Sequence, residues 1–146
     1  MSVEDKLAIQ EMITRYSYAY DSKDAKAVAE LFVEDGIFEV IVPGASSPTV
    51  SLSSRAAIFE WAKKRHQLNA SSRARHYQSG LIFDELTTDT ARSRTMLLLT
   101  RQTAPDALPS VILTGVYHDK WRKTGEGWSL VHRTARVDRD PGFAKH

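Results

Sequence analysis

The order of its local patterns is the feature that most limits how this chain can fold. Helical periodicity fills the first half, and from about residue 74 polar and apolar residues alternate as they do in β strands. The strands expected there span residues 74–83, 90–101, 110–121 and 128–138, with hairpin loops at 104–106 and 123–127. Helices followed by an antiparallel run of strands indicate an α+β fold. Because these strands are longer than average, we expect a strongly curved, mostly antiparallel sheet, a cone-shaped barrel closed by three N-terminal helices.

The first half of the chain supplies those helices. The first helix, capped by Ser2 or Asp5, should end at Asp21. The other elements expected are a helix at 25–32, a strand at 37–42, a loop at 45–53, and a third helix from a Ser53 or Ser54 cap to about His66. With 146 residues and no linker, residues 1–146 are predicted to form a single domain.

Composition argues against several classes of function. The chain has no cysteine, so thiolate metal sites, disulfides and cysteine nucleophiles are excluded. A net charge of +2 gives no reason to expect nucleic acid as a partner, and the densest basic run, residues 63–65, is typical of one exposed helix face. No apolar run approaches the length of a membrane span, and the N-terminus does not resemble a signal peptide, so a cytoplasmic location without membrane binding is expected.

Asp21, at the end of the first helix, can be interpreted in two ways. In an apolar pocket it could act with a histidine as part of a general base, since the negative end of the helix dipole disfavours its charged form. At 100° per residue, however, it falls away from the apolar stripe and on the side of Thr14 and Ser17. It could therefore simply begin a solvated turn, which is the commoner role of a polar residue at a helix end.

Three histidines, His76, His118 and His132, fall in expected strands. His132 shares parity with Trp128 and Leu130, and His118 shares parity with Val116 and Thr114, so both are expected to face inward. No two of the three have ligand spacing within one element, so we expect no metal site. His66 lies at a polar helix end and is not expected to take part in a site.

Arg133 has the opposite parity to Trp128. If it were buried, it would need a carboxylate or an anionic substrate group as its partner. An arginine that reaches solvent across the edge of a sheet needs neither.

Three features of the chain together resemble the SnoaL-like superfamily. They are Tyr20-Asp21 at the end of the first helix, the run at residues 31–36, and Arg75-His76-Tyr77 at the start of the second strand. Within it the chain is most similar to scytalone dehydratase and hexachlorocyclohexane dehydrochlorinase. This resemblance implies that Asp21 and His76 form the catalytic dyad, that Tyr20 lies beside it, and that Arg133 reaches the cavity. It also implies no metal, no organic cofactor, and assembly into trimers or dimers.

The predicted function is therefore that of a small-molecule lyase or isomerase, with Asp21 and His76 as a cofactor-free general base. The side chains expected to contact a small apolar or aromatic substrate are those of Tyr16, Tyr20, His118, His132 and Arg133. The alternative is a ligand-binding or assembly module without catalysis. A homo-oligomer is expected in either case, because Leu97, Leu99 and Val111 are expected to lie on the outer face of the sheet.

Overall fold

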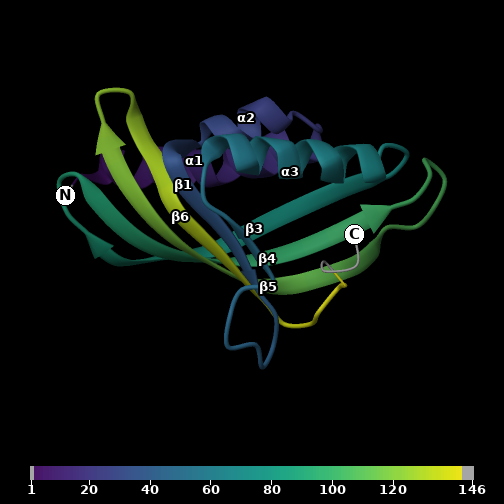
Figure 1. Cartoon of the computed structure of the whole chain (residues 1–146). Helices are drawn as coiled ribbons and strands as arrows, with labels where there is room; N and C mark the ends of the chain where they lie inside the picture. Colours follow the sequence, from purple (N-terminus) through teal and green to yellow (C-terminus); the bar gives the residue numbers. More distant parts are fainter. Residues whose placement is uncertain (1, 143–146) are drawn as a thin grey trace.

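The computed structural model describes residues 2–142 and confirms the α+β prediction. Its helices are α1 (Val3–Asp21), α2 (Ala25–Glu30) and α3 (Arg55–Leu68). Its strands are β1 (Phe32–Ile41), β2 (Val50–Leu52), β3 (Arg73–Leu86), β4 (Thr90–Gln102), β5 (Ser110–Thr124) and β6 (Gly127–Val137). The strands form one sheet in the order β2-β1-β6-β5-β4-β3, in which only β1 and β6 are parallel. Figure 1 shows this sheet curving beneath the three helices, which cover its concave side.

Short polar side chains set where the helices begin. The Ser2 hydroxyl accepts a hydrogen bond from the backbone N–H of the first turn of α1 at 3.1 Å, and Ser54 does the same for α3 at 3.0 Å. Asp24 caps α2 in this way at 3.0 Å. Between α1 and α2, Lys23 has a φ of 62°, and this left-handed residue turns the chain two residues after Asp21.

The second helix and the first strand differ from the expectation. Helix α2 ends at Glu30, and β1 begins at Phe32 instead of Ile37. The pairing of β1 with β6 shifts between Phe32 and Ile37, so residues 33–36, which lie between the expected helix and the expected strand, form an irregularity within β1. The expected loop at 45–53 also contains β2, which pairs antiparallel with β1.

The two faces of β4 show which side of the sheet holds the core. Leu97 and Leu99 are only 5% and 8% exposed and face the helices, whereas Leu98 is 38% exposed. The expectation that Leu97 and Leu99 lie on the outer face is therefore wrong, and three consecutive leucines carry no alternation that could have decided it. The outer face instead carries exposed hydrophobic residues, which we call the outer apolar patch: Tyr77, Ile82, Met96, Leu98 and Val111.

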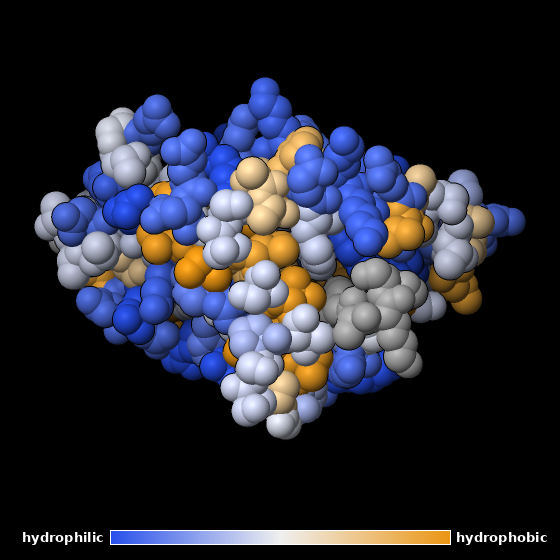
Figure 2. Space-filling view, in the orientation of Figure 1, coloured by the Kyte–Doolittle hydropathy of each residue, from blue (hydrophilic) through white to orange (hydrophobic). Residues whose placement is uncertain are grey.

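Figure 2 shows one face, on which hydrophobic residues gather in a band across the middle between hydrophilic margins. Between residues 2 and 142, no helix has the combination of length and apolar character needed to cross a membrane.

Candidate active site

An apolar pocket lies between the helices and the concave face of the sheet. It has about 770 Å³ of empty space, including its open mouth. Helices α1 and α3 and every strand except β2 contribute to its lining. Aliphatic and aromatic side chains make up most of its wall: Tyr16, Tyr20, Phe38, Val40, Trp61, Leu97, Leu99, Leu113, Tyr117 and Val137. Concave, mainly apolar spaces with a few polar groups are typical small-molecule sites.

Asp21 and His76 meet in the lining of this pocket. Asp21 Oδ1 lies 2.6 Å from His76 Nδ1, and Asp21 Oδ2 accepts a hydrogen bond from the His76 backbone N–H at 2.9 Å. The side chains are 6% and 8% exposed. Both oxygens of one carboxylate therefore hold one histidine, which fixes the orientation of the ring.

The burial of Asp21 follows from a second contact surface on α1. Ser17 lies one helical turn before Asp21, so the two side chains share a face of the helix. On β3, His76 and Gln78 share the inward face, because side chains two residues apart point to the same side. Gln78 Nε2 donates to Ser17 Oγ at 2.8 Å, parallel to the Asp21–His76 contact. Strand β3 thus covers the polar side of the helix, and the solvated-turn interpretation of Asp21 is wrong.

Tyr16 and Tyr20 also line the pocket, beside the Asp21–His76 pair. The Tyr20 ring is 4.8 Å from the His76 ring and 5.9 Å from the Tyr16 ring, centroid to centroid. Burial raises the pKa of both phenols. Both remain protonated at neutral pH, so each can donate a hydrogen bond.

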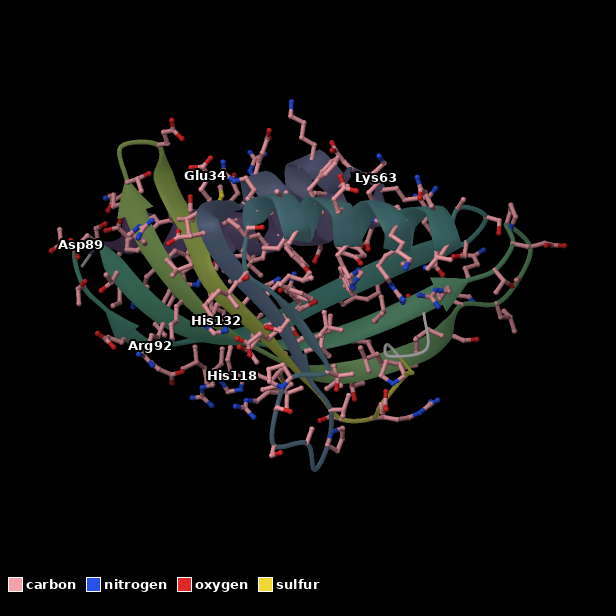
Figure 3. All side chains as sticks on the ribbon, viewed as in Figure 1. Glu34, Lys63, Asp89, Arg92, His118 and His132 are labelled. Atoms are coloured by element: carbon pink, nitrogen blue, oxygen red, sulfur yellow. The ribbon has the colours of Figure 1, made fainter. Side chains whose placement is uncertain are left out.

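His118 and His132 do not face this pocket. Along β5 the buried residues are the odd-numbered positions from Leu113 to Trp121, so His118 lies on the opposite face. His132 also lies on the outer side, with its Nε2 2.8 Å from Glu39 Oε1. Figure 3 shows both histidines on the part of the sheet away from α3. The expectation that they face inward is wrong, and neither lines the pocket.

Arg133 is buried, but it does not line the pocket either. Its Nε and Nη2 each donate to a different oxygen of Asp119 at 2.9 Å. Its guanidinium carbon lies 4.2 Å from the centroid of the Tyr16 ring and 3.8 Å from that of Tyr117. Burial alone would lower the pKa of Arg133, but the charge of Asp119 raises it, so the guanidinium stays charged. The partner of this buried arginine is therefore a carboxylate of the protein, and the two tyrosine rings separate it from the pocket.

The pocket contains polar residues that the sequence did not suggest. His66, at the end of α3, is 9% exposed, and its ring lies 4.9 Å from that of Tyr20. Burial, followed by the positive charge of Lys23, lowers the pKa of His66. Lys23, Arg65 and Arg101 are further basic side chains in the lining. The apolar spacing of α3 gave one signal, since residues 58, 62 and 66 share a face and the first two are an isoleucine and an alanine.

No metal centre is visible in the described part of the chain. Residues 2–142 hold no group of three or more His, Asp or Glu side chains placed to bind one ion. The three strand histidines are divided between the two faces of the sheet, with only His76 in the pocket.

Comparison with known proteins places this chain in a family. A model of the SnoaL-like domain matches residues 1–134. The chain belongs to the SnoaL-like domain family. The search of curated proteins gave no match.

Solved structures share the SnoaL-like fold of this chain over most of its length. Rv3472, a protein of unknown function from Mycobacterium tuberculosis, is 26% identical with a TM-score of 0.77, covering 91% of this chain and 71% of that one. An NTF2-like protein with a cystatin-like fold from Novosphingobium aromaticivorans is also 26% identical, with a TM-score of 0.80 and coverage of 98% and 88%. A protein from the same organism, provisionally named a scytalone dehydratase, is 22% identical, with a TM-score of 0.75 and coverage of 92% and 85%. At that identity the last likeness shows the fold alone.

Proposed function

We propose that this SnoaL-like chain is a cofactor-independent lyase or isomerase, which removes a proton from a carbon atom of a small, mainly apolar molecule. The observation that carries the proposal is the Asp21–His76 pair, with 2.6 Å between Oδ1 and Nδ1, in the wall of an apolar pocket. A strand histidine held by a buried carboxylate is a common arrangement of a general base. The name of the dehydratase-like neighbour is consistent with this class of reaction.

The contacts of Asp21 determine which nitrogen of His76 can act. A carboxylate accepts hydrogen bonds, so the proton of neutral His76 belongs on Nδ1 and the lone pair on Nε2. Nε2 makes no hydrogen bond to any residue between 2 and 142, which leaves it available to a substrate. When Nε2 takes a proton from carbon, the ring becomes a cation, and Asp21 stabilises it at close range with little exposure to water.

Tyr20 supplies a proton donor next to this base. Its pKa is raised by burial, so the phenol keeps its proton, and its ring lies 4.8 Å from that of His76. A donor in this position can stabilise negative charge on an enolate oxygen, or on a hydroxyl or halide as it leaves. Proton removal at Nε2 and charge stabilisation by the phenol together describe an elimination or an isomerisation.

The test combines a substrate screen with substitutions in the dyad. Cyclic ketones, β-hydroxy ketones and halogenated rings are incubated with the protein in D₂O, and NMR follows deuterium incorporation at carbon and formation of the unsaturated elimination product. Asp21→Asn and His76→Gln should each reduce the rate by about 10²–10⁴-fold, the usual contribution of a general base. Because Asp21 is buried and bonded, thermal unfolding of each variant is measured alongside.

The chain provides a matched control in its second histidine–carboxylate pair. His132 and Glu39 lie 2.8 Å apart but outside the pocket, so His132→Gln should leave the rate unchanged. Folded dyad variants that keep the wild-type rate would refute the mechanism. Ligand binding without turnover in the wild-type protein would instead favour the binding-module alternative.

A further inference from the structure

The basic side chains of the pocket outnumber its carboxylates. Lys23, Arg65 and Arg101 line it, whereas Asp21 is the single carboxylate among the described lining residues. Both oxygens of Asp21 already contact His76. Lys23 Nζ donates to the carbonyl oxygen of Ser72 at 2.8 Å, a contact that leaves its charge uncompensated. An otherwise apolar pocket thus carries excess positive charge.

Arg101 is the clearest instance of this imbalance. It follows Leu97 and Leu99 at two-residue spacing on the inward face of β4, so it is the last inward side chain before the strand ends. Its Nε is buried and has no hydrogen-bond partner in the described part of the chain. Among residues 2–142, Arg101 forms no ion pair with a carboxylate. Burial, followed by the like charge of Arg65, lowers the pKa of Arg101.

Arg65 approaches the same place from the helical side. Its guanidinium carbon lies 5.7 Å from the centroid of the Trp61 ring, on α3. Arg65 and Arg101 also line a second hollow, with Asn69, Leu99 and Leu113 common to both spaces. The two arginines therefore lie where the apolar pocket joins this second hollow, Arg65 on α3 and Arg101 on β4, and we take this junction as the opening of the pocket.

We propose that the pocket takes an acidic substrate: a flat, mainly apolar molecule with a carboxylate that Arg101 and Arg65 bind at the opening, while its ring extends toward His76. A carboxylate matches the planar fork of N–H donors in a guanidinium, and charge-assisted bonds of this kind are the stronger hydrogen bonds in proteins. It would give the buried Nε of Arg101 its missing acceptor and remove the repulsion between two like charges. The proposal rests on the proposed function only in treating the bound molecule as the substrate.

The experiment compares two ligands of the same shape that differ in charge. Binding of 2-naphthoate and of neutral 2-naphthamide is measured by isothermal titration calorimetry. The wild-type protein should bind the acid at least tenfold more tightly than the amide. Arg101→Gln should weaken binding of the acid about tenfold or more and change binding of the amide less than twofold. Arg101→Lys keeps the charge but loses the planar fork of N–H donors, so its affinity for the acid should lie between those of the wild-type protein and Arg101→Gln.

Two further variants separate this proposal from others. Arg122→Gln removes the same charge from an exposed position and should leave both affinities unchanged. Asp21→Asn should keep the preference for the acid even though its catalysis is lost, so failure of the dyad and failure of the acidic-ligand proposal give different results. Any one of three results would overturn the proposal. These are equal affinity of the wild-type protein for the two ligands, no detectable binding of 2-naphthoate at millimolar concentration, and a preference for the acid that survives in Arg101→Gln.

Discussion

Asp119→Asn is expected to destabilise the protein strongly, because it leaves Arg133 charged and buried without a counter-ion. Both side chains of this pair are 0% exposed, and the two hydrogen bonds between them are 2.9 Å long. At an effective dielectric constant of about 20, unit charges about 4 Å apart attract each other by about 4 kcal/mol. Removing one partner of a buried ion pair typically costs about 3–5 kcal/mol, of a total stability of about 5–15 kcal/mol.

Urea unfolding followed by far-ultraviolet circular dichroism measures this loss. A surface pair of the same fork geometry serves as the control: Arg94 donates through Nε and Nη2 to Asp84 at 2.8 Å each, but these side chains are 45% and 40% exposed. Asp84→Asn should hardly move the urea midpoint, because water screens an exposed pair. In the double variant Asp119→Leu/Arg133→Met no charge stays buried, so it should be more stable than Asp119→Asn. A loss below about 1 kcal/mol in Asp119→Asn, or a double variant that is less stable still, would refute the reasoning.

Other predictions test a close contact, a buried titration and the outer face. Gly115→Ala should cost about 1–3 kcal/mol in urea unfolding, because its Cβ would lie 2.5 Å from a carbonyl oxygen of β6. Gly125→Ala, with nothing within 4 Å, should cost far less, and equal losses would contradict the explanation. His66 has a lowered pKa when folded, so the unfolded chain takes up its proton first and stability falls as the pH drops below about 6.5. His66→Phe should therefore lose less stability between pH 7 and pH 5 than the wild-type protein, and an identical slope would contradict this. Light scattering should show a homo-oligomer that Leu98→Lys, in the outer apolar patch, shifts toward monomer; a wild-type monomer at every concentration would contradict it.

The fold was predictable because its signals are local. Capping serines, helical periodicity and long alternating strands each determine a nearby element, and their order implies an α+β sheet covered by helices. The short strand β2 was missed because its three residues form a strand only by pairing with β1. Local propensity contains no information on such a partner.

The Asp21–His76 contact required a different kind of information. Helical periodicity assigned Asp21 to the polar side of α1, and that assignment is correct for the helix alone. The decisive fact is that β3 presents polar residues of its own to that side, so that Ser17 meets Gln78 and Asp21 meets His76. Two polar residues at helical spacing and two at strand spacing form matching pairs, a relation visible in the sequence only once the two elements are known to pack together.

Strand β6 shows how one inserted residue decides which side chains can reach the interior. Its pairing with β5 passes from Trp121↔Leu130 directly to Lys120↔His132, so Val131 is the extra residue of a bulge. Before the bulge the even-numbered residues face the core, and after it the odd-numbered residues do. With unbroken alternation, His132 would point inward and Arg133 outward, leaving the buried Asp119 without its partner. Because of the bulge, Arg133 lies opposite Asp119 on the inner face, and the His132 side chain lies on the outer face, where it contacts Glu39. The sequence shows the parity of each half of the strand, whereas the bulge between them is consistent with the need of the buried Asp119 carboxylate for a cation, which Arg133 supplies.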